Sequence, residues 1–123
     1  MTGSDKVIAL VDDMFFASKI RGAAEQCGRS LVRVRTQEEL ESELIEPPAL
    51  VLIDLNFTRL DPLAAITFLK SRPETRAISI IGFLSHVQIE LMRAAEQAGC
   101  DYVMPRSKFS QQLVPILSGN TAL

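Results

Sequence analysis

The chain has 123 residues, 47% of them hydrophobic, and a formal net charge of −2 at pH 7. This size and apolar content exclude a disordered chain and predict a folded domain whose core needs no disulfide or metal. The sequence has no basic tract, no apolar stretch approaching the roughly 20 residues that span a bilayer, and no signal peptide. We therefore expect neither nucleic acid nor a membrane as a partner.

We expect a single domain over residues 1–123, with its core over about 6–117 and loose termini. Cys27 and Cys100 lack the Cys-x-x-Cys or Cys/His spacing of a zinc or redox site. They are expected to be two buried, reduced thiols of a cytoplasmic protein. His86 is the only histidine, which excludes a His-rich metal cluster.

The chain begins with an alternation of strand and helix patterns. Residues 6–11 are apolar after the first and predict a buried strand. Residues 14–27 predict a helix that ends at Gly28. Its apolar stripe consists of Phe16, Ile20, Ala23 and Cys27. In residues 31–35 valines alternate with arginines, a pattern typical of a half-exposed edge strand.

A second helix and a central strand follow. Thr36 and Glu39 have the spacing of a capping box, which predicts a helix with Leu40 and Leu44 on its apolar face. Pro47 stops that helix. The unbroken apolar run that then leads into Asp54 predicts a strand buried on both faces, as in a parallel sheet covered by helices.

The next segments continue the alternation. Residues 56–60 predict a loop, and Asp61 followed by Pro62 predicts the start of a helix that runs to about Ser71. Residues 78–84 predict a fourth strand. Residues 86–98 predict a helix that Gly99 closes. Its apolar stripe consists of Val87, Leu91, Ala94 and Ala98.

Residues 101–104 predict a short fifth strand. Ser107 or Ser110 is then expected to cap a last helix, which Pro115 kinks or ends early. The tail from Ser118 is expected to fray. Because strand and helix alternate five times, the chain predicts an α/β fold, a doubly wound five-stranded parallel sheet with helices on both faces.

Three aspartates stand at two strand ends: Asp12 and Asp13 after the first strand, and Asp54 after the third. In the flavodoxin-like strand order 2-1-3-4-5 these strands are neighbours, so their carboxyl ends converge. Carboxylates about 4 Å apart repel by roughly 4 kcal/mol per pair at an effective dielectric of about 20. A divalent cation would relieve that repulsion, and hard oxygen ligands suit Mg²⁺. The alternative is that Asp12 or Asp13 caps the first helix and that Asp54 is a turn residue.

Ser85 ends the fourth strand. Its hydroxyl could bond to an anion held at Asp54, or it could cap the helix that begins at His86; the two roles are compatible.

Together, the segments Val11-Asp12-Asp13 and Leu52-Ile53-Asp54-Leu55-Asn56, the Ser85 strand end and residues 99–105 carry a resemblance. The chain resembles the receiver domain of two-component response regulators, of the chemotaxis-regulator type, over essentially its whole length. The resemblance implies the flavodoxin-like receiver fold. It also implies that the third-strand aspartate accepts a phosphoryl group from a histidine kinase or phosphotransfer protein.

By that resemblance Asp54 is the phospho-acceptor. Asp12, Asp13, Asp54 and the backbone carbonyl of Asn56 would hold Mg²⁺. Ser85 matches the hydroxyl residue that moves to meet the phosphoryl group. Tyr102 matches the fifth-strand aromatic residue whose rotamer reports that move. A carboxylate can form an aspartyl phosphate, with the metal neutralising the transferred oxygens.

The chain departs from the family at the lysine-proline pair that normally ends the fifth strand. Aligned on Pro105, the lysine position holds Met104, which cannot bond to phosphate. Aligned by distance from Asp54, it falls near Arg106, which could supply a cation, although Arg and Lys are not equivalent. Lys108 is a less suitable substitute. The alternative is that Arg106 and Lys108 are solvated surface charges.

Two further departures lie near the acceptor. Phe57 adds bulk where the family has a turn with glycine, and His86 replaces a residue that is commonly small. The His86 ring could hinder entry of the phosphodonor or point to solvent; we favour solvent.

The sequence predicts a single-domain receiver that is not an enzyme beyond self-phosphorylation and slow self-dephosphorylation. Its output would be protein contact through the fourth helix, fifth strand and fifth helix, from a monomer or weak homodimer. The alternative is a degenerate receiver that binds proteins without phosphorylation. An unrelated nucleotide-binding enzyme is disfavoured, because the sequence has no Gly-x-x-x-x-Gly-Lys-Ser/Thr or Gly-x-Gly-x-x-Gly motif.

Overall fold

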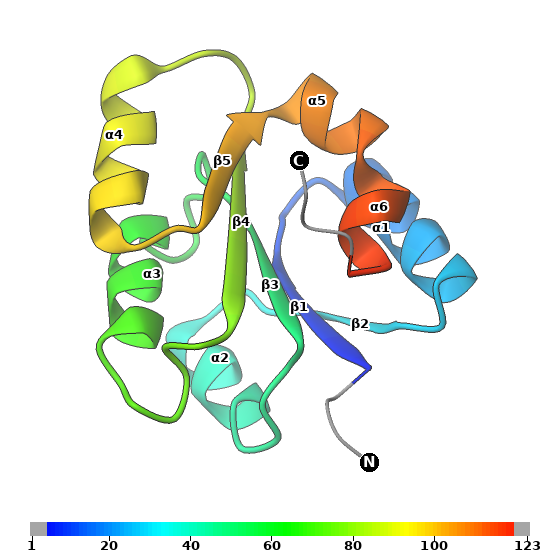
Figure 1. Ribbon diagram of the computed structural model, residues 1–123, viewed down its shortest axis with the longest axis horizontal. Helices are drawn as coiled ribbons and strands as arrows, with labels where there is room; N and C mark the ends of the chain where they lie inside the picture. The colour runs from blue at the N-terminus through cyan, green and yellow to red at the C-terminus, as the bar shows by residue number, and fades with distance from the viewer. Residues whose placement is uncertain (1–4, 120–123) are drawn as a thin grey trace.

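In the computed structural model, which describes residues 5–119, five parallel strands form one sheet (Figure 1). The strands are, in chain order, β1 (Lys6–Leu10), β2 (Ser30–Arg33), β3 (Leu50–Asp54), β4 (Ser79–Leu84) and β5 (Tyr102–Pro105). Across the sheet they lie in the order β2-β1-β3-β4-β5, and each neighbouring pair is parallel. The predicted fold class and strand order are confirmed, and β1 lies directly beside β3.

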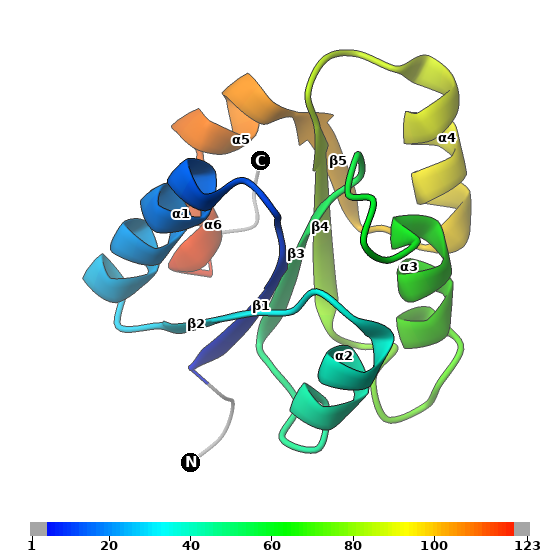
Figure 2. The ribbon, with the colours of Figure 1, turned by 180° about the vertical axis from the view of Figure 1, so that it is seen from behind.

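Helices cover both faces of the sheet, as Figures 1 and 2 show from opposite sides. One face carries α1 (Met14–Gln26), α5 (Arg106–Gln111) and α6 (Leu113–Leu117). The other carries α2 (Gln37–Glu43), α3 (Pro62–Lys70) and α4 (Ile89–Ala98). Each set of helices packs against the sheet in its own buried apolar cluster. Between residues 5 and 119, no helix combines the length and apolar character that crossing a membrane requires.

The central strand β3 is buried at every position. Leu50 and Leu52 belong to the cluster beneath α1, α5 and α6, whereas Val51 and Ile53 belong to the opposite one. Because both faces of the strand need apolar side chains, its sequence shows no polar alternation. The strand ends in Asp54, which is 8% exposed. The fold thus delivers one shielded carboxylate to the edge of the sheet.

Helix termini follow the local signals in several places. Asp61 caps α3, since its Oδ1 accepts the N–H groups of Leu63 and Ala64 at 3.0 and 3.2 Å. Thr36 Oγ1 accepts the Glu39 N–H at 3.1 Å. Gly28, with φ of 71°, follows the end of α1 in the left-handed region that favours glycine. The predicted caps of these three helix ends are confirmed.

The predicted start of α4 is wrong. The helix begins at Ile89, with Gln88 at the N-cap position, and not at His86. Ser85 is therefore not a helix cap, and Val87 is 61% exposed and not part of an apolar stripe. The cause is a long-range contact: the Asn56 side chain accepts the Ser85 N–H and donates to Gln88, which holds residues 85–88 out of the helix.

The last helix also departs from the prediction. Neither Ser107 nor Ser110 caps it, because α5 begins at Arg106, immediately after Pro105, and no side chain caps it. The expected kink is confirmed: the chain breaks at Gln112 between α5 and α6, and Pro115 cannot donate to the preceding turn.

Two smaller predictions are corrected. In α1 the buried alanines are Ala17 and Ala24, whereas Ala23 and Cys27 are half-buried, so the apolar stripe is rotated relative to the prediction. Both cysteines are free as expected, but only Cys100 is buried. The predicted loose leader falls mostly on residues 1–4, and the end of the fraying tail on residues 120–123, which lie outside the described residues.

Candidate functional site

The carboxyl ends of β1 and β3 lie at the same edge of the sheet. The register pairs Leu10 of β1 with Ile53 of β3, so the chain leaves β1 through Asp12 and Asp13 near the point where β3 ends in Asp54. The side chain of Asp54 is 12% exposed, and those of Asp12 and Asp13 are 47% and 42% exposed. The fold therefore shields Asp54 and leaves the acidic pair open to solvent.

Asp54 has a different neighbour on each oxygen. Its Oδ1 accepts the N–H of Asn56 at 2.9 Å, and its Oδ2 lies 3.5 Å from Nη2 of Arg106. Burial raises the pKa of Asp54, while the Asn56 N–H and the Arg106 charge act in the opposite direction. Asn56 thus fixes Oδ1, and Oδ2 is the oxygen that faces the Arg106 guanidinium.

Arg106 joins two of the three carboxylates. Its Nη1 lies 3.4 Å from Asp13 Oδ2, and its Nη2 faces Asp54. The guanidinium stacks over the ring of Phe16 at 4.5 Å and also lies 5.8 Å from the centroid of Phe83. Such cation–π contacts contribute about 0.5–2 kcal/mol. The aromatic rings thus hold a positive charge in place beside Asp54.

The structure decides between the two alignments of the fifth strand. Met104 is buried in the apolar cluster beneath α1 and α5, where its side chain is not available to bind an anion. Arg106 is the residue at the Asp54 carboxylate, and Lys108 is exposed on α5. Arg106 is therefore the cation beside Asp54, and it is not a freely solvated surface charge.

The acidic pair also has partners. Asp13 Oδ1 accepts the N–H of Phe16 at 3.1 Å and so caps α1. This backbone N–H is the main reason that the pKa of Asp13 is lowered; desolvation opposes it, and the Arg106 charge adds to the lowering. Asp12 Oδ1 pairs with Nε of Arg59 at 2.9 Å. Asp13 is thus both a helix cap, as the alternative interpretation had it, and a partner of Arg106, while its role as a metal ligand stays a prediction.

Arg33 supports the same loop from the edge strand β2. Its guanidinium donates to the carbonyl oxygens of Val11, at 3.0 Å from Nη2, and Asp12, at 3.3 Å. The turn that carries the acidic pair is therefore tied to the sheet. Sequence reasoning missed Arg33, Arg59 and Phe16 as site residues, because each reaches the site by a contact across the fold that no local pattern signals.

Ser85 lies in a polar network with Asn56, the residue that donates to Asp54. Its N–H and hydroxyl both contact Asn56 Oδ1, at 2.9 and 3.2 Å, and its Oγ lies 3.3 Å from His86 Nδ1. Asn56 Nδ2 donates to Gln88 Oε1 at 3.1 Å. In this arrangement the Ser85 hydroxyl is engaged by Asn56 and His86, so a move toward Asp54 would require it to exchange partners.

The remaining residues singled out in the sequence lie as follows. His86 is exposed, which agrees with the solvated orientation favoured for it. Phe57 is 5% exposed and packs in the core cluster beneath α2, α3 and α4, so its bulk lies in the core and not in the open space around Asp54. Tyr102 is half-buried at the start of β5 and packs against the cluster beneath α1, α5 and α6. Among the described residues no hydrogen bond joins Tyr102 to Ser85, so the predicted role of Tyr102 stays a prediction.

Comparison with solved structures places this arrangement in a known fold. A putative response regulator from Chloroflexus aurantiacus matches with a TM-score of 0.83 and 17% identity, over 98% of this chain and 99% of that one. The phosphorylated cyanobacterial phytochrome response regulator RcpA matches with a TM-score of 0.73 and 20% identity, over 95% and 91%. The fold is that of a response regulator receiver domain.

A third match is to a receiver structure that contains a phosphorylated aspartic acid. The response regulator protein from Burkholderia pseudomallei, solved with a phosphorylated aspartic acid, a calcium ion and citrate, matches with a TM-score of 0.77 and 17% identity. The match covers 94% of this chain and 67% of that chain. No family model and no curated protein matches the sequence. The likeness therefore lies in the receiver fold.

The receiver site has the right donor chemistry for a divalent ion but not the right arrangement. Asp12, Asp13 and Asp54 are hard oxygen donors of the kind that Mg²⁺ and Ca²⁺ prefer. However, no three His, Cys, Asp or Glu side chains between residues 5 and 119 come together in a way that could hold a metal. Guanidinium groups engage all three carboxylates instead. As it stands, this arrangement does not fit the ion.

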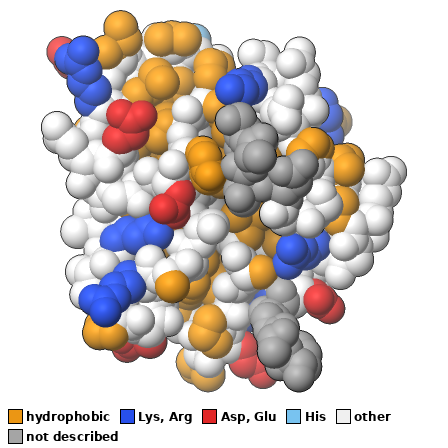
Figure 3. Space-filling model, viewed as in Figure 1, with side chains coloured by type: hydrophobic (Ala, Val, Ile, Leu, Met, Phe, Trp, Pro, Cys, Tyr) orange, Lys and Arg blue, Asp and Glu red, His pale blue; other side chains and the backbone are white. Residues whose placement is uncertain are grey.

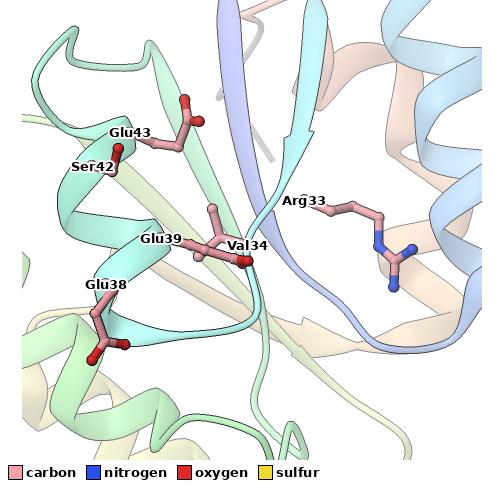
Figure 4. A pocket seen from close by; sticks show the side chains of 6 residues that line it. All are labelled: Arg33, Val34, Glu38, Glu39, Ser42 and Glu43. Atoms are coloured by element: carbon pink, nitrogen blue, oxygen red, sulfur yellow. The ribbon is translucent and has the colours of Figure 1, made fainter.

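A cavity elsewhere in the receiver fold does not involve the site. It lies between β2 and α2, has a volume of about 370 Å³, and is shown in Figure 4. Its polar side chains come mainly from α2, while the Arg33 side chain points away from them. The cavity contains none of the predicted site residues.

Proposed function

We propose that this chain is a signalling receiver that accepts a phosphoryl group on Asp54 from a histidine kinase or phosphotransfer protein. The observation that carries the proposal is the Arg106 guanidinium, 3.5 Å from the Oδ2 of a carboxylate that the fold shields from water. The receiver fold adds support, since two structures that share it are described as phosphorylated, one of them on an aspartic acid. We further propose a cytoplasmic location, where such donors act.

The proposed chemistry is a transfer between two nucleophiles. Asp54 Oδ2 attacks the phosphorus of a phosphohistidine, the new P–O bond forms, the P–N bond breaks, and the donor imidazole keeps the electron pair. The Asn56 N–H holds Oδ1 and so orients the attacking oxygen. Arg106 then neutralises charge on the transferred oxygens with its planar fork of N–H donors. Ser85 is proposed to exchange Asn56 for a phosphoryl oxygen.

We propose Mg²⁺ as the divalent ion of this site, held by Asp12, Asp13, Asp54 and the backbone carbonyl of Asn56. Such an ion supplies positive charge to the phosphoryl oxygens when bound. The arginines that now engage the carboxylates would first have to move away.

Output is proposed to run through the face formed by α4, β5 and α5, the face that Figure 3 presents. Hydrophobic side chains gather there over the start of α4 and the loop before it. Val87 and Ile89 in this segment are 61% and 58% exposed. Because this loop carries Ser85, a change of hydrogen-bond partners at Ser85 would alter the presented surface and thereby bias binding of a downstream protein.

The proposal is tested by incubating the protein with acetyl phosphate and Mg²⁺ and measuring its intact mass. We expect the added mass of one phosphoryl group in the parent chain and none in the Asp54→Asn variant. Beryllofluoride, which mimics the phosphoryl group, should shift the amide NMR signals of Asn56 and Ser85. Absence of both the mass increase and the NMR shifts in a folded parent would contradict the proposal.

A second candidate is a receiver that binds its partner without phosphorylation. The specific observation that favours it is that arginines neutralise all three carboxylates and that Asn56 and His86 engage the Ser85 hydroxyl. This candidate predicts the same NMR spectrum with and without beryllofluoride. It also predicts that Asp54→Ala leaves partner affinity unchanged.

A further inference from the structure

The receiver site contains cations that belong to the protein itself. The Arg106 guanidinium spans Asp13 and Asp54 at 3.4 and 3.5 Å, and Arg59 pairs with Asp12 at 2.9 Å. A guanidinium stays protonated throughout the accessible pH range. The positive charges of Arg59 and Arg106 therefore partly neutralise the three carboxylates without any added ion.

We propose that Arg59 and Arg106 are built-in counter-cations, which a divalent ion must displace before it can bind the three carboxylates. The inference rests on the proposed function, because it concerns the metal of that same site. It predicts a receiver whose affinity for Mg²⁺ is set by the two arginines and not by the carboxylates alone.

Charge is the first reason for competition. A divalent ion bound by the carboxylates would lie within a few Å of a guanidinium that contacts the same oxygens, and like charges at such distances repel strongly. Space is the second reason. The two terminal nitrogens of Arg106 face Asp13 and Asp54, the carboxylates that the ion would have to bridge.

Packing explains why Arg106 does not simply swing away. Its guanidinium lies 4.5 Å from the Phe16 ring centroid and 5.8 Å from that of Phe83. Phe83 stacks in turn on Phe109 at 4.3 Å, and both rings are fully buried. Moving the guanidinium would uncover this aromatic surface, which opposes displacement by a metal.

The distances support the same interpretation. Both Arg106 contacts are longer than the roughly 2.8 Å of an optimal charge-assisted hydrogen bond. The guanidinium is thus placed mainly by the rings beneath it and not drawn in by the carboxylates. Its position would persist when one carboxylate is altered, as expected of a counter-cation that is part of the fold.

The test is a titration of MgCl₂ into the folded protein without any phosphodonor, followed by the amide NMR signals of Asp13 and Asn56. Compared with the parent, Arg106→Gln should bind Mg²⁺ at least about tenfold more tightly, because one opposing charge is removed. Arg59→Gln should show a smaller gain, since its partner Asp12 is half-exposed. Arg106→Lys keeps the charge and should stay closer to the parent than Arg106→Gln.

Arg72→Gln is the matched control. Arg72 also pairs with a carboxylate, Glu74 at 2.9 Å, and also stacks on a ring, Phe68 at 4.8 Å, but it lies beyond the end of α3. Its removal changes the net charge equally and should leave the Mg²⁺ affinity at the parent value. Equal Mg²⁺ affinity in the parent, Arg106→Gln and Arg59→Gln would overturn the inference, as would an equal gain in Arg72→Gln.

Folding of each variant is checked by its NMR spectrum. If Arg106→Gln does not fold, the exposed Arg59 decides the matter by itself, because its removal leaves the aromatic packing untouched. The MgCl₂ titration contains no phosphodonor, so a result that contradicts the inference would not contradict the proposed acceptor role of Asp54. Conversely, failure to label Asp54 with acetyl phosphate would not change the expected order of Mg²⁺ affinities.

Discussion

Among residues 5–119, Asp54 is the only buried acidic side chain, and its titration follows from that position. Burial raises its pKa above the ordinary value, so the folded state binds the proton more tightly than the unfolded state does. Its contribution to stability is therefore fully present below about pH 3.9, the unfolded value, and is lost as the pH rises through the raised folded value.

Asp54→Asn should consequently stabilise the protein at neutral pH, by on the order of 1 kcal/mol, because it removes a desolvated charge and keeps an oxygen for the Asn56 N–H. The gain should shrink as the pH falls through the raised pKa of Asp54, because the parent carboxyl then loses its charge as well. Urea unfolding of both proteins across this pH range measures the difference.

Glu46→Gln provides the control, since Glu46 is exposed and its replacement should leave the stability nearly unchanged. If Asp54→Asn is less stable than the parent at neutral pH, its ion pair with Arg106 outweighs the desolvation of the carboxylate, and our account of Asp54 is wrong.

At the same scale, the sequence predicted the acidic residues better than their partners. Asp54 could be found because an apolar run that ends in a carboxylate is a local pattern. For the cation beside Asp54, the sequence left two alignments open, one with Met104 and one with Arg106 at that position. The choice between them depends on which way the chain turns after β5. The fold buries Met104 in the core and turns Arg106 onto Phe16. No spacing rule contains that geometry.

At the scale of elements, the helix caps separate local from long-range causes. Asp61→Ala should lower the free energy of unfolding by about 1 kcal/mol, because Asp61 satisfies two N–H groups at the start of α3. Ser107→Ala should change it by less than about 0.5 kcal/mol, because α5 begins without a side-chain cap. Denaturant unfolding of both variants gives the comparison, and equal losses would restore the predicted serine cap.

The elements that were predicted well are those whose signals are local. The strands β1 and β3 were predicted from apolar runs, and α3 from Asp61-Pro62. The start of α4 was missed because the segment before it is held by Asn56, which lies 32 residues before Gln88 in the sequence. The stripe of α1 was off by one position at Ala24, since alanines at 23 and 24 leave the helical period ambiguous.

At the scale of the whole molecule, the sheet separates two apolar cores, of which only one contacts the proposed site. The cluster beneath α1, α5 and α6 contains the rings that support Arg106, and so it belongs to the proposed site. The other cluster joins α2, α3 and α4 to the sheet and contains Cys100. The strand order was predictable because parallel α/β chains admit few topologies. The core that each strand residue joins follows from the alternation of side chains along the strand, as in β3.

Cys100 can report how this second core opens. Its thiol lies at the junction of α4 and β5 and donates to the Tyr102 carbonyl at 3.1 Å. Burial raises its pKa to about 11, so both access and ionisation protect it in the folded state. In a Cys27→Ser variant at about pH 9, iodoacetamide should label Cys100 only through unfolding, whereas an unfolded thiol is largely ionised there.

The labelling rate should therefore rise with urea in parallel with global unfolding, if α4 and β5 leave the sheet only when the whole fold opens. The half-buried Cys27, followed in a Cys100→Ser variant, should react at low urea, because it needs only a local movement between α1 and α6. Labelling of Cys100 well below the unfolding midpoint would instead show that α4 and β5 detach on their own. The proposed output face would then be the least stable part of the receiver.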